Sequence, residues 1–369
     1  MQRYIVMLSG ALALAACTAC QVVSLQTQYA QEPPVQIAGL DLAGGADVRL
    51  DLAFRVPVRA TILVSTAADM EARPVAVVTG EFDTTLSWVD AGAAAAPGVR
   101  YYRVQVQTGA SAWKSTDEWA MFVQPREAGQ RYLVSVPVAL GAENRLDRLL
   151  GRQLGLGLHA GASTNDADRL ELATGEGAWR AVYWMEGPDG VARWWNVEAN
   201  AAAEDAIAPG QGFWIQRGAA AAKQGVRGAF WGRTYARPYG AVTIRLDEKR
   251  GTPFGLPASR PLQHRRADVA QRVAPSPLDP LGFAVVGSGG KTSDHRRADE
   301  NGDQIWVWEN NEWKGYYWLM DHVGAKWDGR WWDNKAAGFA DFALEPGEGY
   351  YYRHRTNQWG GADFEWTPP

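Results

Sequence analysis

The chain has 369 residues, of which 46% are hydrophobic and 21% are charged, so it can form two or three domains with substantial cores. The formal net charge is −4, and the lysines and arginines are spread along the chain, which argues against a nucleic-acid-binding protein or a polybasic membrane surface. The composition, with 18 Trp and 40 Gly, also excludes collagen, a coiled coil, a polytopic membrane protein and a disulfide scaffold.

Residues 1–16 have the features of a secretory signal peptide. Arg3 supplies a positive charge, and an apolar run extends from Tyr4 to Ala16. This run is shorter than a transmembrane helix and has the length of a signal-peptide core. The sequence therefore predicts export.

The apolar run ends in Leu14-Ala15-Ala16-Cys17, which resembles the bacterial lipobox. The resemblance implies that Cys17 is diacylated and becomes the new N-terminus. Two acyl chains give stable anchoring, so the expected location is the cell envelope, at the outer membrane or the cell surface. The alternative is an ordinary cleaved signal peptide with an incidental Cys. Residues 17–36 are polar, contain a Pro pair, and are interpreted as a lipidated tether.

Residues 37–125 contain short runs with the two-residue period of half-buried β-strands. The clearest is Val48 to Phe54, in which apolar and polar residues alternate. Further strands are predicted at 60–65, 74–78, 86–89, 102–106 and 119–123. Short strands separated by turns predict an antiparallel sandwich.

The stretch TTLSWVDAGAAAAPGVRYYRVQV, residues 84–106, resembles the second half of a bacterial fibronectin type III domain. The shared features are a strand that ends in Asp90, a Pro97-Gly98 turn and a Tyr-rich strand. The resemblance implies that Tyr102 makes the corner hydrogen bond of that family, and that the module acts in spacing or binding rather than catalysis. Phe54 stands where the family has an early Trp.

The rest of the chain repeats itself, because three motifs occur twice in the same order. The pairs are Trp179–Trp184 with Trp313–Trp318, Arg193-Trp-Trp-Asn196 with Arg330-Trp-Trp-Asp333, and Pro209-Gly-Gln-Gly212 with Pro346-Gly-Glu-Gly349. The repeats predict two tandem Trp-rich antiparallel β modules, residues 131–230 and 241–369. This layout resembles Trp-rich segments of secreted bacterial proteins, a resemblance that implies no activity.

Each predicted module has the same design. Leu170 and Leu172, or Ile305 and Val307, lie on one face of a strand, and aromatic residues supply the core. Each Pro-Gly-x-Gly motif predicts a type II turn with Gly at its third position. In the first module we also expect a short helix that Asn144 caps, with one apolar face made of Leu146, Leu149, Leu150 and Leu154.

Two loops resemble ligand-binding motifs. Residues 285–292 resemble a phosphate-binding loop, but Val285 stands where that loop needs Gly, so we interpret them as a Gly-rich strand exit and expect no nucleotide. Asp299, Asn301 and Asp303 place oxygens at alternate positions, as calcium loops do. However, Gly302 is misplaced for that motif, and a polar turn is the favoured alternative. No other cofactor is expected.

The tryptophans also suggest a glycan site. Trp306 and Trp308 align with Glu171 and Ala173 of the first module, so the fold does not need aromatic residues there. A patch of Trp306, Trp308, Trp327, Trp331 and Trp332 would stack on sugars if it were exposed. The alternative is that this face packs against the other module or a neighbouring chain.

No catalytic motif is found. The His residues lack metal-ligand spacing, and the nucleophile-elbow motif of hydrolases is missing. Our leading hypothesis is a non-catalytic cell-envelope lipoprotein with a structural or adhesive role, whose partners are the membrane, through its lipid, and other surface molecules. The second hypothesis is a carbohydrate-binding surface protein, and the third is a secreted hydrolase.

Overall fold

The computed structural model describes residues 33–43, 46–66, 72–108, 111–114, 118–126, 131–139, 144–146, 160–175, 178–218, 226–234, 242–244, 251–256, 262–264, 302–309, 312–319, 330–333, 335–336, 338–354 and 363–366. Within these ranges every regular element is a β-strand, and the pairings between strands are antiparallel except for one isolated bridge. The mainly β, antiparallel prediction is thus confirmed.

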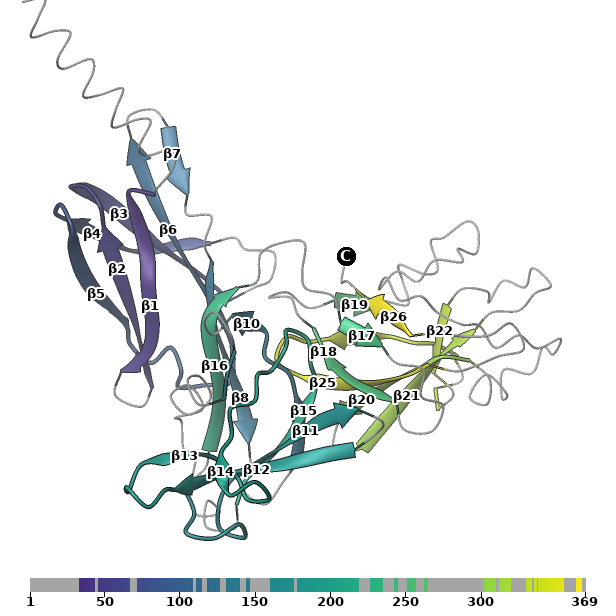
Figure 1. The fold of residues 1–369 in the computed structure, drawn as a ribbon. Coiled ribbons are helices and arrows are strands. Elements are labelled where there is room, and N and C mark those ends of the chain that lie inside the picture. The colour runs from purple at the N-terminus through teal and green to yellow at the C-terminus, as the bar shows by residue number, and fades with distance from the viewer. Residues whose placement is uncertain are drawn as a thin grey trace, which may run out of the picture.

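The N-terminal part consists of two sheets packed face to face, which we call the N-terminal sandwich (Figure 1). The smaller sheet has the order β1-β2-β5, with β1 (Val35–Ala43), β2 (Asp47–Phe54) and β5 (Thr84–Asp90). The larger has the order β10-β16-β8-β6-β3-β4, with β7 paired to β6. Its strands are β3 (Val58–Ser65), β4 (Arg73–Gly80), β6 (Gly98–Thr108), β7 (Ser111–Lys114), β8 (Trp119–Arg126), β10 (Val138–Ala139) and β16 (Val226–Thr234).

Two further sheets have the same strand order as each other. The first Trp-rich sheet is β14-β13-β12-β11-β15-β9, built from β9 (Arg131–Val134), β11 (Arg169–Gly175), β12 (Ala178–Glu186), β13 (Ala192–Asn196), β14 (Ala201–Ala202) and β15 (Phe213–Gln216). The second Trp-rich sheet is β23-β22-β21-β20-β25-β18, built from β18 (Thr252–Gly255), β20 (Gln304–Glu309), β21 (Glu312–Leu319), β22 (Arg330–Asp333), β23 (Gly338–Phe339) and β25 (Gly349–Arg353).

Two strand pairs accompany the second Trp-rich sheet. They are β17 (Val242–Ile244) with β26 (Phe364–Trp366), and β19 (Leu262–His264) with β24 (Phe342–Leu344). The buried side chains of β17, β24 and β26 join those of the sheet in one core.

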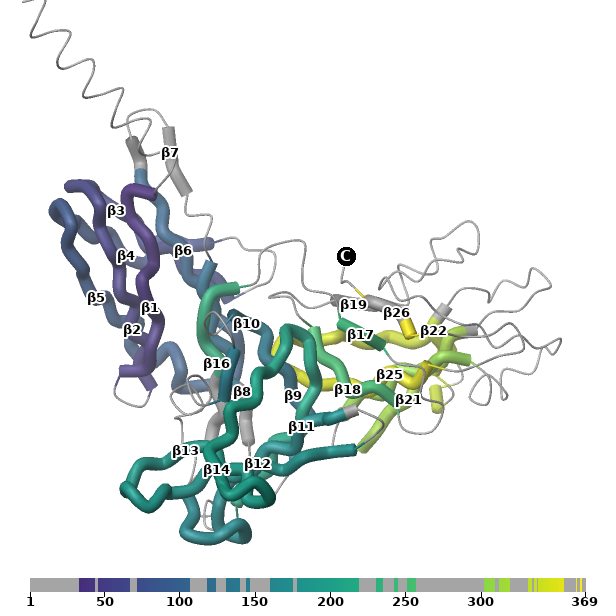
Figure 2. The backbone as a smooth tube through the Cα atoms, in the orientation of Figure 1, coloured from purple at the N-terminus to yellow at the C-terminus, as the bar shows by residue number. Residues whose placement is uncertain are grey.

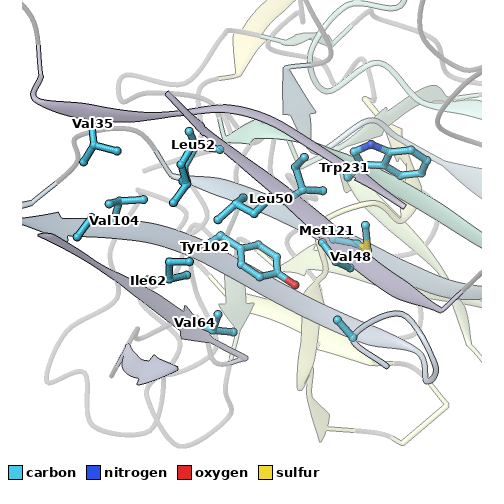
Figure 3. Packing of buried hydrophobic residues seen from close by; sticks show 14 of the residues in the cluster. Val35, Val48, Leu50, Leu52, Ile62, Val64, Tyr102, Val104, Met121 and Trp231 are labelled. Atoms are coloured by element: carbon cyan, nitrogen blue, oxygen red, sulfur yellow. The ribbon is translucent and has the colours of Figure 1, made fainter. Parts of the chain in front are cut away.

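The seven-stranded sheet has a hydrophobic core on each of its faces. Tyr102, Met121 and Trp231 face the β1-β2-β5 sheet (Figure 3). Their neighbours Tyr101, Phe122 and Phe230 belong to the core of the first Trp-rich sheet. Because successive side chains of a strand point to opposite faces, β6, β8 and β16 contribute to both cores. After the first Trp-rich sheet the chain returns to the sandwich as β16, beside β8 (Figure 2).

The two Trp-rich sheets contact each other through equivalent residues. The Ser135 N–H donates to the Gly347 carbonyl at 3.2 Å, and the corresponding Gly255 N–H donates to the Gly210 carbonyl at 2.8 Å. The bridges Val134↔Glu348 and Gln211↔Phe254 are reciprocal in the same way. Contacts in which each half uses the same residues are typical of a two-fold interface.

The predicted strands and turns are largely present. The six runs predicted in residues 37–125 match β2, β3, β4, β5, β6 and β8. Gly210 and Gly347 have φ angles of 72° and 87°, and each turn closes with a hydrogen bond from the next residue, as a type II turn requires. The strand β1 begins at Val35, inside the stretch interpreted as tether.

The helix predicted to begin at Asn144 does not start there. Arg145 forms an isolated β-bridge with Ala206, and Asn144 has a φ of 43°, which lies in the left-handed region, so no right-handed helix begins at these residues. The remaining helix residues, 147–154, lie outside the described ranges, as do the signal peptide, Cys17 and the loop at 285–292. In the part that the structure describes, no helix is long and apolar enough to span a membrane.

Candidate functional site

Two of the tryptophans predicted to bind glycans are buried. Trp331 is 0% exposed, and its ring centroid lies 5.3 Å from that of Trp318 in the core. Trp332 is 6% exposed and packs with Tyr317 and Phe339. Neither offers a ring face to a ligand, which corrects the predicted patch. Trp327 lies outside the described residues.

Trp306 and Trp308 do lie on the outer face of β20, as the alignment with the first module predicts. Trp308 is 37% exposed. Trp306 is half-buried and lies over Gly315, where an added Cβ would come within 3.2 Å of its ring. Its Nε1–H donates to Gln304, and its edge meets the ring of Tyr317. Of the four predicted residues that the structure describes, these two remain available to a ligand.

Three residues that the sequence analysis missed extend this surface across both Trp-rich sheets. The ring of Trp313 lies 5.1 Å from Trp308 and 5.4 Å from Tyr351, measured between centroids. It also lies 6.1 Å from Trp214 of the first sheet. The Trp214 Nε1–H donates to the Tyr351 hydroxyl at 2.9 Å. We call Trp308, Trp313, Tyr351 and Trp214 the junction cluster.

The sequence does contain a signal for part of this cluster. Trp214 and Tyr351 are equivalent positions, each following a Pro-Gly-x-Gly turn. Phe213 and Ile215 are buried, so strand alternation places Trp214 on the opposite, outer face. That the two equivalent residues meet each other depends on the packing between the sheets.

The junction cluster has a charged end on the first Trp-rich sheet. The Arg131 guanidinium lies 4.1 Å from the centroid of the Trp214 ring, a cation–π contact. Arg131 also pairs with Glu171, and Arg169 contacts the same carboxylate at 2.7 Å. Burial raises the pKa of Tyr351, so its hydroxyl stays protonated at neutral pH and can donate a hydrogen bond. An apolar ring surface is thus continuous with hydrogen-bonding groups.

The calcium hypothesis finds no assembled site in the described residues. Asp299 and Asn301 lie outside them, whereas Asp303 is completely buried. The Asp303 carboxylate accepts a hydrogen bond from the Tyr352 hydroxyl at 2.9 Å and lies 3.0 Å from His354 Nδ1. Among the residues placed by the structure, no group of three or more His, Cys, Asp or Glu could hold a metal ion.

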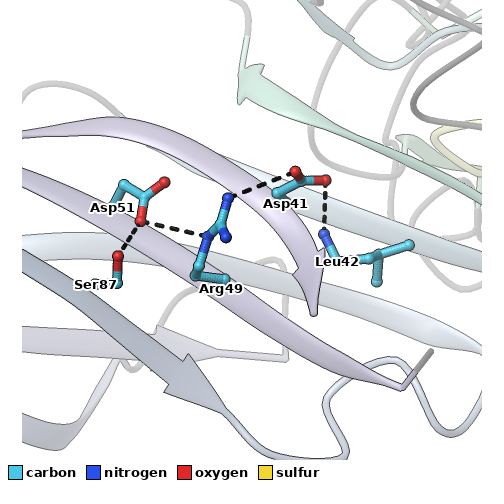
Figure 4. Close-up of polar contacts among 5 residues, drawn as sticks. All are labelled: Asp41, Leu42, Arg49, Asp51 and Ser87. Carbon is cyan, nitrogen blue, oxygen red and sulfur yellow. Dashed lines mark hydrogen bonds and ion pairs between the residues drawn. The ribbon is translucent and has the colours of Figure 1, made fainter. Parts of the chain in front are cut away.

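The N-terminal sandwich contains polar contacts of a structural kind. The Tyr102 hydroxyl donates to Asp90 at 3.0 Å, and Arg100 contacts the same carboxylate at 3.1 Å. On the outer face of the three-stranded sheet, Arg49 lies between Asp41 and Asp51 (Figure 4). Ion pairs on an exposed face stabilise little, so this face is a solvated surface rather than a site.

Comparisons with protein-family models, with curated proteins and with solved structures found no match. The fold and the site define a mainly β protein of several antiparallel sheets with clustered aromatic residues. The case for its function therefore depends on its own sequence and geometry.

Proposed function

We propose that the protein is a non-catalytic lipoprotein of the bacterial cell envelope with a structural or adhesive role. The observation that carries this proposal is the sharing of β6, β8 and β16 between two cores, which joins the sandwich and the first Trp-rich sheet in one body. The second Trp-rich sheet is joined to this body through reciprocal hydrogen bonds. A tether attached to such a body holds a defined surface away from the membrane.

The fine architecture is part of the same proposal. We regard the sandwich as fibronectin type III-like, because a three-stranded sheet of its first, second and fifth strands faces a sheet containing the others. The hydrogen bond from Tyr102 to Asp90 supports this view. We regard the two Trp-rich sheets as duplicated modules, supported by their shared strand order and reciprocal contacts.

Lipidation is tested by metabolic labelling with a clickable fatty acid. The wild-type chain and a Cys20→Ser variant are expected to carry the label in the membrane fraction, whereas a Cys17→Ser variant is expected to lose it. The Cys20 variant is the matched control, because it removes the neighbouring thiol from the same tether. Label retained after Cys17→Ser contradicts the proposed anchor.

The adhesive role is tested on whole cells. A strain that lacks the protein is expected to attach less well to a surface or to neighbouring cells, and expression of the wild-type chain should restore attachment. Externally added protease is expected to digest the protein on intact cells. Unchanged attachment, together with full protection from protease, contradicts a role at the surface.

Carbohydrate binding is a second candidate function, and the exposure of Trp308 favours it. A large aromatic side chain that is 37% exposed, at a position where the first module has Ala173, contributes little to the fold. Aromatic side chains with one wet face are typical of recognition surfaces.

A further inference from the structure

We infer that a linear oligosaccharide with all-equatorial hydroxyls binds along the junction cluster and contacts both Trp-rich sheets. The inference rests on the proposed carbohydrate binding and adds the place of the site and the class of sugar. The proposed site is formed by both sheets. The second sheet supplies Trp308, Trp313 and Tyr351, and the first supplies Trp214 and Arg131.

The comparison between the two sheets indicates which aromatic residues the fold does not require. The first sheet has the same strand order with Glu171 and Ala173 at the positions of Trp306 and Trp308. By contrast, Trp331 is buried, as is its counterpart Trp194. Trp306 and Trp308 are therefore additions to the outer face, and a ligand accounts for them better than packing within the sheet does.

The geometry of the cluster fits an extended ligand. Rings follow one another from Trp308 to Trp313 and then to Trp214, with centroid separations of 5.1 and 6.1 Å and interplanar angles of 64° and 86°, so each ring meets the next edge to face and is a separate contact along the path of the ligand. The Arg131 guanidinium continues the series on Trp214 at 4.1 Å. The surface thus crosses from one sheet to the other, which favours a chain of several sugars over a single one.

The chemistry of the surface favours a sugar over an apolar partner. A pyranose with equatorial hydroxyls presents axial C–H groups on both of its faces, and these pack on aromatic rings. Its hydroxyls radiate in the plane of the ring, where Arg131, Glu171 and the Tyr351 hydroxyl can form hydrogen bonds. Recognition sites commonly combine aromatic side chains with a few such polar groups.

The test is calorimetric titration of the full mature chain, solubilised in detergent, with cellohexaose and with chitohexaose. Wild-type protein is expected to bind at least one of these probes. Trp308→Ala and Arg131→Ala are each expected to weaken binding by about tenfold, the scale of one aromatic contact. Matched controls are Trp179→Ala, the first-sheet counterpart of Trp313, and Phe82→Ala, a side chain that is 70% exposed on the sandwich. Both controls are expected to bind as the wild type does.

The possible outcomes distinguish failure of the junction site from failure of the proposed carbohydrate-binding function. Binding that Trp308→Ala and Arg131→Ala leave unchanged, in variants with wild-type melting temperatures, overturns the junction site while carbohydrate binding stands. An equal loss in the Trp179→Ala control overturns it as well. A wild-type chain that binds neither probe overturns both the junction site and the carbohydrate-binding function, and leaves the structural or adhesive role.

Discussion

A buried Asp occupies the equivalent position in each of the two Trp-rich sheets. Asp168 is completely buried and lies 3.0 Å from Arg217 Nε, while the equivalent Asp303 lies 3.0 Å from His354 Nδ1. Asp168 also accepts a hydrogen bond from the Gly218 N–H at 2.6 Å. A buried carboxylate needs such hydrogen-bonding partners, and the partner side chain is Arg in one sheet and His in the other while the Asp is the same.

Removal of Asp168 is therefore expected to destabilise the protein strongly. Asp168→Ala leaves the Arg217 guanidinium buried without its carboxylate, which costs about 3–5 kcal/mol in comparable cases. Urea denaturation followed by tryptophan fluorescence measures the change. Asp189→Ala is the control, because Asp189 lies in an exposed turn and its partner Arg193 of β13 is also partly exposed, so a small change is expected there. Equal effects of the two substitutions contradict this account.

A second single residue, Glu345, is expected to make the stability of the protein depend on pH. Burial raises the pKa of its carboxyl above the ordinary value of 4.5. The folded state then binds more protons than the unfolded state just above pH 4.5, so stability falls as the pH rises through the folded pKa. Glu345→Gln is expected to raise the free energy of unfolding at pH 7 and to change it little below pH 4.5. The first sheet has Ala208 at this position, so no charge is required there.

Denaturant titrations of both chains at pH 4 and pH 7 measure this effect. A stabilisation by Glu345→Gln that is the same at both pH values would mean that ionisation of the carboxyl is not its cause.

At the scale of elements, the alternation of polar and apolar residues predicted β2, whereas β16 carries no such signal and was not predicted. Val48 to Phe54 alternates because one side of β2 is exposed. In β16, Phe230 and Trp231 are consecutive and both buried, so no alternation of polar residues marks the strand. The junction cluster could not be predicted either, because strand alternation places Trp214 on the outer face of its sheet but does not show which aromatic ring of the other sheet it contacts.

The two faces of β16 lead to a prediction about consecutive residues. Trp231→Ala is expected to speed amide hydrogen exchange mainly in β1 and its partner β2, since Trp231 packs in the sandwich core and β16 contacts β1 across it. Phe230→Ala is expected to speed exchange mainly in β11 and β12, since Phe230 belongs to the other core. Mass spectrometry of exchanged peptides locates the effect, and the same pattern from both variants would contradict a sheet with two separate cores.

At the scale of the whole molecule, the two Trp-rich sheets pair as the subunits of a symmetric dimer do, but their outer faces differ. The reciprocal hydrogen bonds of Ser135 and Gly255 follow the symmetry. The symmetry is broken at two equivalent positions, because the second sheet has Trp308 where the first has Ala173, and Trp306 where the first has Glu171. The shared interface holds the sheets together, whereas the unmatched residues lie on the outer face, where the glycan site is proposed.

The glycines at this interface provide the last prediction. A Cβ at Gly349 would lie 2.5 Å from Leu133 Cγ and 2.8 Å from the Val134 nitrogen, so Gly349→Ala forces the two sheets apart. We expect a loss of about 1–3 kcal/mol in the free energy of unfolding, as in other overpacked sites, and a red shift of tryptophan fluorescence as the junction cluster opens. Gly39→Ala is the matched control, because the nearest atom to its Cβ is an Asp51 oxygen at 3.7 Å. If Gly349→Ala leaves both readouts at the level of this control, the sheets are not held together by the close approach described above, and a site that spans them loses its basis.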